Sequence, residues 1–379
     1  MDFDLSDDQE ALQSAAAALL DSRSTLEQVR KVADNPGHID RALWAQMAEQ
    51  GWLAIERPEA SGGLGMGFVE VAVLSEQVGL HLAPVPFAGT VLALHAIETA
   101  TQTATGGAST YSGVSELVER LSSGKAIGAI TWTRRPDQVV AERSTGAADG
   151  WVLTGRPDPV VFGPVADVVI VPAEIAGSAG ARELFLVENP PESSRVSQSA
   201  MDLTRSLGWL SLEATPAILL ADTAFSSLAD RAAVAVSAEM LGAAQRVLDM
   251  TVQYAKDRVQ FGRPIGSFQA VKHRCADMLV DVEGMRSAVY YAAWCIAAES
   301  SDASSAASAA KIWCSEAAKR VMASGLQVHG GIGFTWEHDM HLFVKRSQLD
   351  QVSFGDTSWH HDRLGLMLRA LAEAGLPVM

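Results

Sequence analysis

From Asp230 to its end the chain is helical, and three long helical patterns in this part constrain the fold more than any other feature. They are RAAVAVSAEMLGAAQRVLDMTVQYAKDR, SFQAVKHRCADMLVDVEGMRSAVYYAAWCIAAE and SAASAAKIWCSEAAKRVMASGLQV. Apolar residues recur in them at the three- and four-residue spacings of amphipathic helices. Each pattern is long enough to span a domain, so together they predict a helical bundle.

Two other patterns precede the bundle. From Leu5 to about Ile97 the chain is also helical, and Ser6 occupies an N-cap position. Between about Lys125 and Thr223, short β-rich runs are bounded by Gly, Pro, Asp or Ser, without long helices between them. This order predicts a small antiparallel β-domain between two helical domains. The expected domains are residues 1–122, 123–226 and 227–379.

Charge and composition narrow the choice of partners. The formal net charge is -16, which argues against nucleic acid or an anionic membrane as the main partner, because both favour a cationic surface. No apolar run reaches the about 20 residues that span a bilayer, and the start MDFDLSDDQEALQ does not resemble a signal peptide.

Cys275, Cys295 and Cys314 form no C-x-x-C pair. We therefore expect reduced thiols and a cytoplasmic protein.

Two motifs accompany the bundle helices. The segment YAKDRVQFGRPIGSFQAVKHRCADM contains R-x-x-F-G-x-x-I-x-x-F-Q, and LQVHGGIGFTWEHDMHLFVKR contains Q-x-x-G-G-x-G-F. Glycines in the second motif allow backbone amides to approach an anion closely. Taken alone, that glycine cluster could also be a tight turn between helices.

Both motifs, together with the order of helices, β-domain and bundle, resemble the acyl-CoA dehydrogenase family over essentially the whole chain. The resemblance implies an N-terminal α-helical domain, an antiparallel β-barrel-like middle domain and a C-terminal four-helix bundle. It also implies an FAD-dependent enzyme that is usually a homotetramer, a dimer of dimers with one FAD per subunit.

The resemblance assigns a role in cofactor binding to three residues of the first motif. By resemblance, Arg258 would meet the FAD pyrophosphate as a charge-assisted donor. Phe261 would pack beside the flavin, and Gln269 would donate to the adenosine part. Alone, Arg258 would more often be a solvated helix-end charge and Phe261 a core residue.

The second motif would act from a neighbouring subunit. Gln327 and Gly331 would reach the cofactor of that neighbour, with the backbone at Gly330 and Gly331 close to the dinucleotide. Thr357 corresponds to the family threonine that touches the flavin or its ribityl part.

The β-domain departs from the family pattern. The family loop T-E-P-G-A-G-S-D is reduced here to ITWTRRPDQVV, in which Thr131 and Thr133 could keep the flavin contact. The family segment W-I-T-N becomes PVVFGP, so the tryptophan that covers the flavin is missing. Both changes concern the wall of the active site.

The family reaction removes the proton α to a thioester and passes hydride from the β-carbon to flavin N5. A carboxylate base must stand over the α-carbon. Most members carry it as the glutamate of Y-E-G-T, and SFGDTSWHHDRLG places Gly355 at that position. Isovaleryl-CoA dehydrogenases carry the base on an earlier helix, at the position of Ala232 here.

Two carboxylates lie near those positions. Asp356 is one residue from the common position, and Glu239 is seven residues beyond Ala232 in the apolar run AVAVSAEMLGAA. Asp356 could instead be a helix N-cap, and Glu239 a structural carboxylate. Three possibilities remain open: Asp356 as base, Glu239 as base, or neither.

Other groups near the site are weaker candidates. His360 and His361 follow closely and are expected in the first turn of a helix. No metal site is predicted, because the spacing of His338, Asp339 and His341 offers no second ligand pair.

The leading hypothesis is α,β-desaturation of an acyl-CoA in fatty acid or lipid metabolism, with electrons passed to an electron-transfer flavoprotein or another acceptor. One alternative is a base-deficient FAD-binding subunit in a hetero-oligomer with a related dehydrogenase subunit. Another is a family member diverted to other flavin chemistry.

Overall fold

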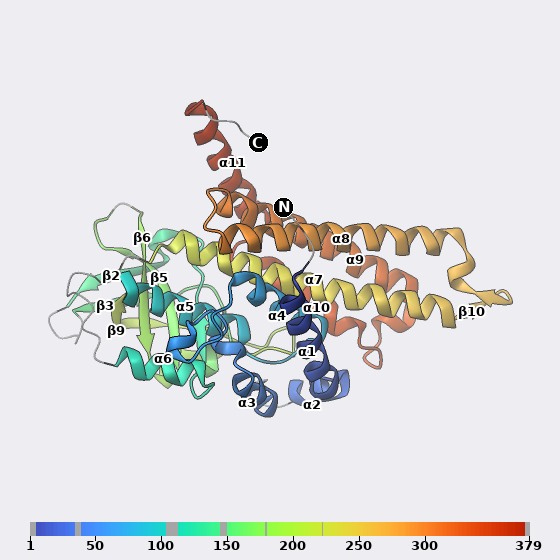
Figure 1. Cartoon of the computed structure of the whole chain (residues 1–379), viewed down its shortest axis with the longest axis horizontal. Helices are drawn as coiled ribbons and strands as arrows, with labels where there is room; N and C mark the ends of the chain where they lie inside the picture. Colours follow the sequence, from blue (N-terminus) through green and yellow to red (C-terminus); the bar gives the residue numbers. More distant parts are fainter. Residues whose placement is uncertain are drawn as a thin grey trace. The chain divides into compact units, whose positions relative to one another are not determined.

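The chain divides into two compact units, both traced in Figure 1. The first comprises Met1–Arg30, Phe68–Ala83 and Ala233–Met379, and the second Lys31–Gly67 and Pro84–Ala232. Our computed structural model describes residues 5–34, 39–103, 113–144, 150–178, 180–221 and 223–375. No helix in these ranges is long and apolar enough to cross a membrane.

The first unit is helical. Its elements are α1 (Asp7–Arg23), the start of α2 (Leu26–Ala33), α4 (Phe68–Leu80), most of α7 (Phe225–Asp257), α8 (Gln269–Ala297), α9 (Ala303–His329), α10 (Met340–Val352) and α11 (Thr357–Glu373). The short hairpin β10 (Val259–Gln260) and β11 (Arg263–Pro264), followed by η6 (Ile265–Ser267), joins α7 to α8, and η7 (Gly330–Phe334) follows α9. The long C-terminal patterns therefore form helices as predicted.

Local signals set the ends of these helices. Ser6 is the N-cap of α1, as predicted, and its partner in the capping box is Gln9. The Gln9 N–H donates to Ser6 Oγ at 3.3 Å, and the Ser6 N–H donates to Gln9 Oε1 at 3.0 Å. These two bonds satisfy donors that a helix start leaves unpaired.

Glycines permit a close crossing of α4 and α7. A Cβ at Gly79 would overlap the backbone of Glu239, and a Cβ at Gly242 would overlap the backbone of Glu76. The backbones can approach only because neither position carries a side chain. The crossing fixes Glu239 in the helical core, where its side chain is 3% exposed.

The second unit contains a β-domain. Its strands are β1 (Gly128–Ile130), β2 (Val139–Arg143), β3 (Trp151–Gly155), β4 (Val160–Val161), β5 (Val168–Ile175), β6 (Arg182–Glu188), β7 (Arg195–Ser197), β8 (Leu207–Leu210) and β9 (Leu212–Leu219). The main sheet has the order β1-β5-β2-β3-β9-β6, and β6 also pairs with β5, so five strands close on themselves. This is the barrel-like domain that the family resemblance implied.

Pairing within this sheet is mostly antiparallel. Two short parallel pairs, β1 with β5 and β2 with β5, depart from the purely antiparallel expectation. A small sheet of β4, β8 and β7 is separate. The barrel encloses an apolar core that includes Val139, Leu153, Val171 and Phe185, each fully buried.

Helices and short 3₁₀ turns complete the second unit. They are the end of α2, α3 (Arg41–Glu49), η1 (Trp52–Ala54), η2 (Glu59–Ser61), α5 (Phe87–Thr103), α6 (Val114–Ser122), η3 (Pro136–Gln138), η4 (Gly163–Val165), η5 (Glu192–Ser194) and the first residues of α7. Helix α5 lies against β1, where Thr90 Oγ1 accepts from the Gly128 N–H at 3.1 Å. This contact connects α5 to the strand that leads to Thr131.

Candidate active site

The first motif lies at the junction of α7 and α8. Arg258 follows the last residue of α7, and Phe261 lies at the tip of the β10–β11 hairpin, where its side chain is 91% exposed. Its ring meets the Phe268 ring edge-on at 6.1 Å, directly before Gln269 opens α8. The Arg258 guanidinium makes no hydrogen bond or ion pair to any residue that the structure describes. Arg258, Phe261 and Gln269 thus form one exposed group.

The second motif lies where α9 ends. Gly330 has φ 63°, a backbone conformation that favours glycine. A Cβ at Gly330 or Gly331 would meet nothing within 4 Å, so the backbone there is open to another molecule. Gln327 is also exposed. The glycine cluster is therefore a helix-to-helix turn, and its backbone stays accessible.

Two threonines follow strand β1 in the second unit. Thr131 and Thr133 are fully buried, and the Oγ1 atom of each lacks a hydrogen-bond partner in the described part of the chain. A buried hydroxyl without a partner is unfavourable by about 1–3 kcal/mol. Both hydroxyls can therefore accept a hydrogen bond from, or donate one to, a polar partner.

These local groups suit a dinucleotide. An exposed guanidinium and an open glycine backbone are ordinary partners of a pyrophosphate, and orphaned hydroxyls suit the polar edge of a flavin. When bound, FAD would supply the hydride acceptor of the reaction. The residues present therefore fit this cofactor.

A buried lysine organises the turn in which the family glutamate is expected. Lys311 of α9 is fully buried, and its Nζ donates to the carbonyl oxygens of Gln351 at 2.9 Å and Gly355 at 2.8 Å. Burial lowers the pKa of Lys311 from 10.5 to about 8, although the carboxylates of Asp350 and Asp356 favour the charged form. The lysine therefore holds the end of α10 and the following turn together.

His360 fastens the same turn from the other side. Its Nε2 lies 3.1 Å from the Phe354 carbonyl oxygen, and its Nδ1 lies 3.3 Å from Ser308 Oγ. Burial lowers the pKa of His360 to about 3, and the charge of Lys311 contributes to this shift. A neutral imidazole in the first helical turn, as predicted, here has a structural role.

Gly355 is confined within this turn. Its φ is 94°, which L-residues rarely adopt. A Cβ would lie 2.7 Å from Trp359 Cε3 and 3.0 Å from His360 Nε2. Any side chain here would need both a strained backbone and displacement of a ring.

Asp356 is the N-cap of α11. Its Oδ1 accepts the Trp359 N–H at 2.9 Å, and its side chain is half-buried. Thr357, the first residue of the helix, is also half-buried. The N-cap alternative for Asp356 thus agrees with its hydrogen bonding.

Glu239 lies deep in the helical unit. Its Oε2 is 3.8 Å from Nη1 of Arg346, which is fully buried. Asp350 follows Arg346 by one turn of α10, and Lys311 lies beside Asp350. Glu239, Arg346, Asp350 and Lys311 are therefore buried charged residues of alternating sign. Glu239 stands at one end of this set, and Asp356, in the turn that Lys311 binds, stands at the other.

Sequence reasoning did not single out Lys311 or Arg346. The available signal was a charged residue inside an apolar helical pattern, as in SAAKIWC for Lys311. That signal marks a residue that needs a partner, but the partner comes from another helix. Among the described residues no group of three or more His, Cys, Asp or Glu could hold a metal ion.

Comparisons with known proteins agree with this architecture. The family model for the acyl-CoA dehydrogenase N-terminal domain matches residues 6–105, and that for the acyl-CoA dehydrogenase C-terminal domain matches residues 223–366. Acyl-CoA dehydrogenase IpdE2 of Mycolicibacterium smegmatis is 35% identical over 344 residues, which are 90% of this chain and 93% of the relative.

Two solved structures are also similar. A variant of the Tcur3481-Tcur3483 steroid ACAD matches with a TM-score of 0.86 and 30% identity over 97% of this chain and 99% of the other. The ChsE4-ChsE5 complex from Mycobacterium tuberculosis matches with a TM-score of 0.85 and 30% identity over 98% and 99%. On this evidence the chain belongs to the acyl-CoA dehydrogenase family and is an FAD-dependent oxidoreductase that acts on an acyl-CoA.

Proposed function

We propose that this dehydrogenase works in a complex with a second, related subunit, and that the second subunit supplies the carboxylate that removes the α-proton. The substrate in this proposal is a steroid-type acyl-CoA. The single observation that carries it is the geometry of Gly355, at the position of the family glutamate. The left-handed φ of 94° and the closeness of Trp359 and His360 leave no room for a side chain.

The other candidate bases are engaged in the fold. Asp356 accepts a backbone N–H as the cap of α11, and a cap contributes about 1 kcal/mol to helix stability. Glu239 lies beside the Arg346 guanidinium, and its side chain is only 3% exposed, as expected of a buried charge that has an opposite charge next to it. Ala232, at the alternative family position, has no ionisable group. These observations favour a base from outside the chain.

Cofactor binding is the chain's own contribution in this proposal. Arg258, Phe261 and Gln269 would hold the pyrophosphate, flavin side and adenosine part of FAD, and Thr131, Thr133 and Thr357 would contact the flavin end. Gln327, Gly330 and Gly331 would approach the FAD of a neighbouring subunit. Their exposure or their lack of internal partners supports these roles.

Similar proteins support the choice of partner and substrate. One solved structure at 30% identity is a steroid ACAD, and another is the complex of ChsE4 with ChsE5. By this analogy the assembly is a dimer of dimers in lipid metabolism. Electrons would pass to an electron-transfer flavoprotein or another acceptor. Three free cysteines support a reducing, cytoplasmic setting.

The test compares the chain expressed alone with the chain co-expressed with a related subunit that carries the Y-E-G-T glutamate. Flavin absorbance is followed while a steroid-type acyl-CoA is added without oxygen. We expect bleaching only in the complex, and loss of bleaching when the partner's glutamate becomes glutamine. Rapid bleaching of the chain alone would refute the proposal.

Two variants assign the base if the chain alone does react. Asp356→Asn should remove bleaching if Asp356 is the base, with FAD still bound, and Glu239→Gln tests the other carboxylate in the same way. In the complex we expect both variants to reduce the flavin at rates close to wild type, provided that they fold.

A further inference from the structure

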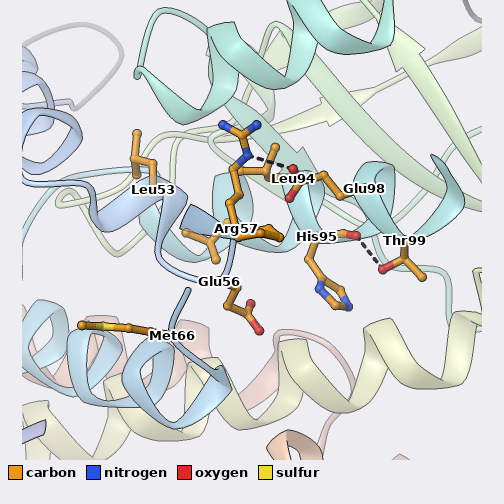
Figure 2. A pocket seen from close by; sticks show the side chains of 10 residues that line it. Leu53, Glu56, Arg57, Met66, Leu94, His95, Glu98 and Thr99 are labelled. Atoms are coloured by element: carbon orange, nitrogen blue, oxygen red, sulfur yellow. Dashed lines mark hydrogen bonds and ion pairs between the residues drawn. The ribbon is translucent and has the colours of Figure 1, made fainter. Parts of the chain in front are cut away.

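A cavity in the second unit lies beside α5. Figure 2 shows its lining, and its volume is ≈ 270 Å³. Pockets that hold whole small molecules usually measure about 300–1,000 Å³. A cavity of this size suits one end of a larger ligand. Its lining residues are Leu53, Glu56, Arg57, Pro58, Met66, Val91, Leu94, His95, Glu98 and Thr99.

One part of the lining is ionic but balanced. Arg57 Nε donates to Glu98 Oε1 at 2.8 Å, as drawn in Figure 2, and Arg57 Nη1 donates to Ser122 Oγ at 3.0 Å. Glu56 accepts from Arg231 Nη1 through both carboxylate oxygens, at 2.8 and 3.0 Å. Two cations and two anions cancel, so a charged ligand group would gain no net attraction. The lining favours an uncharged polar group.

His95 is a further polar group of the lining. Its ring nitrogens make no hydrogen bond to any residue in the described ranges, although the ring lines the cavity. Burial lowers the pKa of His95 to about 3, and the nearby charge of Arg231 contributes. A neutral imidazole offers one N–H donor and one nitrogen acceptor. A hydroxyl group can satisfy either of them.

The rest of the lining is apolar except for Thr99, whose Oγ1 donates to the His95 carbonyl oxygen at 2.9 Å. Leu53, Pro58, Met66, Val91 and Leu94 provide hydrocarbon surface next to His95. Such surface favours burial of a carbon skeleton, at about 25 cal/mol per Å². The cavity therefore combines a hydrocarbon wall with the neutral imidazole of His95.

In the sequence, the cavity residues are close to two positions that the family resemblance assigns to the acyl and flavin site. Arg231, which holds Glu56 at the cavity, immediately precedes Ala232, the helix position where isovaleryl-type relatives carry their base. Helix α5 lines the cavity and also binds β1 through Thr90 and Gly128, three residues before Thr131. Both positions belong to the second unit.

We propose that this cavity binds the far end of the acyl group, and that this end is a compact alicyclic group bearing a hydroxyl that hydrogen-bonds His95. The inference rests on the proposed steroid-type substrate. It adds that this substrate carries a hydroxyl group at the end of the acyl group that is far from the thioester. His95 is then a specificity residue that distinguishes hydroxylated from plain hydrocarbon acyl groups.

The experiment measures binding with acyl-CoA pairs and does not require turnover. The FAD-loaded protein, in its complex where one forms, is titrated calorimetrically with 3-cyclohexylpropanoyl-CoA and with its 3- and 4-hydroxycyclohexyl analogues. We expect at least one hydroxylated analogue to bind about three- to tenfold more tightly, as one net hydrogen bond allows. Equal Kd values for all three in the wild-type protein would overturn the proposal.

Variants locate the effect. His95→Leu should remove the preference, and His95→Gln, which keeps a donor and an acceptor, should retain part of it. Thr101→Ala, at an exposed position of the same helix, is the control and should preserve the preference. Unfolding midpoints establish that each variant is folded, and a preference that survives in folded His95→Leu contradicts the assignment.

The two proposals fail separately. If the proposed function is wrong, the flavin bleaching expected in the complex is not seen, while the difference in Kd between the analogues remains. A wrong assignment of the cavity appears as equal Kd values, whatever the bleaching result.

Discussion

The Nζ atom of Lys311 donates a hydrogen bond to the carbonyl oxygen of Gly355 at 2.8 Å. The family motif Y-E-G-T predicts the glutamate at position 355, so a buried cation holds the backbone at the point where a catalytic side chain is expected. The bond stabilises the left-handed turn from Phe354 to Gly355, with φ values of 56° and 94°. The turn is therefore part of the fold as well as of the site.

Gly355→Ala should destabilise the protein by about 1–3 kcal/mol, because its Cβ requires a strained φ and meets the rings of Trp359 and His360. Urea unfolding measures the change. Gly365→Ala is the matched control, since Gly365 is exposed within α11 and an added Cβ meets nothing within 4 Å. The control should gain up to about 1 kcal/mol. Equal effects at both positions would show that the turn is not constrained.

Lys311→Met should lower the free energy of unfolding by about 3–5 kcal/mol, since it removes the buried cation beside Asp350 and leaves two carbonyl oxygens without their donor. Lys319→Met, at an exposed position of the same helix, should stay within about 0.5 kcal/mol. Denaturant unfolding compares the two variants. A loss no larger than that of Lys319→Met would mean that Lys311 does not hold the turn.

His360 should make the free energy of unfolding depend on pH. Its folded-state pKa of about 3 lies below the ordinary 6.5, so below pH 6.5 the unfolded chain binds a proton that the folded chain does not. The stability from the neutral imidazole is thus complete above pH 6.5 and is lost as pH falls toward 3. The expected slope is about 1.4 kcal/mol per pH unit.

His360→Gln removes that titration. Unfolding free energies between pH 6.5 and 3 should therefore fall less steeply in this variant than in wild type, by about one proton. His361→Gln, at the exposed neighbouring position, should keep the wild-type slope. Parallel curves for wild type and His360→Gln would contradict a neutral buried His360.

Thr131→Val should separate folding from cofactor binding. The Thr131 Oγ1 has no partner within the described residues, so replacing it with a methyl group should leave the FAD-free unfolding midpoint unchanged or raise it. The rise in midpoint on adding FAD should become smaller, because the contact to the flavin is lost.

Thr90→Val provides the contrast, because Thr90 Oγ1 accepts the Gly128 N–H. This variant should lose about 1 kcal/mol without FAD. If Thr131→Val loses as much and keeps the full FAD effect, the proposed flavin contact is wrong.

Local pattern was enough to predict much of the fold. Ser6 was recognisable as an N-cap because capping depends on residues only three apart. The long C-terminal helices and several strands, such as β3 and β6, coincide with runs identified by period and by bounding turn residues. The short strands β4, β7 and β8 have only two, three and four residues, which carry too little periodicity to identify a strand.

The site was predictable only in part. The two motifs identified Arg258, Phe261, Gly330 and Gly331 as cofactor residues. Their exposure suits that role, but exposure depends on the fold and cannot be read from a motif. The buried hydroxyl of Thr131 lacking a partner among the described residues could not be foreseen, since burial depends on distant segments.

The amino acids alone are enough to recognise the family, the order of helical and β segments, and the lack of a carboxylate at positions 355 and 232. What the remaining charges do becomes visible only in the packed helices: Glu239 lies beside Arg346, Lys311 binds Gly355, and Asp356 caps α11. The difference comes from the distance along the chain over which each interaction acts. Helix periods and caps depend on neighbours within a few residues, whereas a buried charge is defined by a partner that is distant in the sequence and reaches it only when the helices pack.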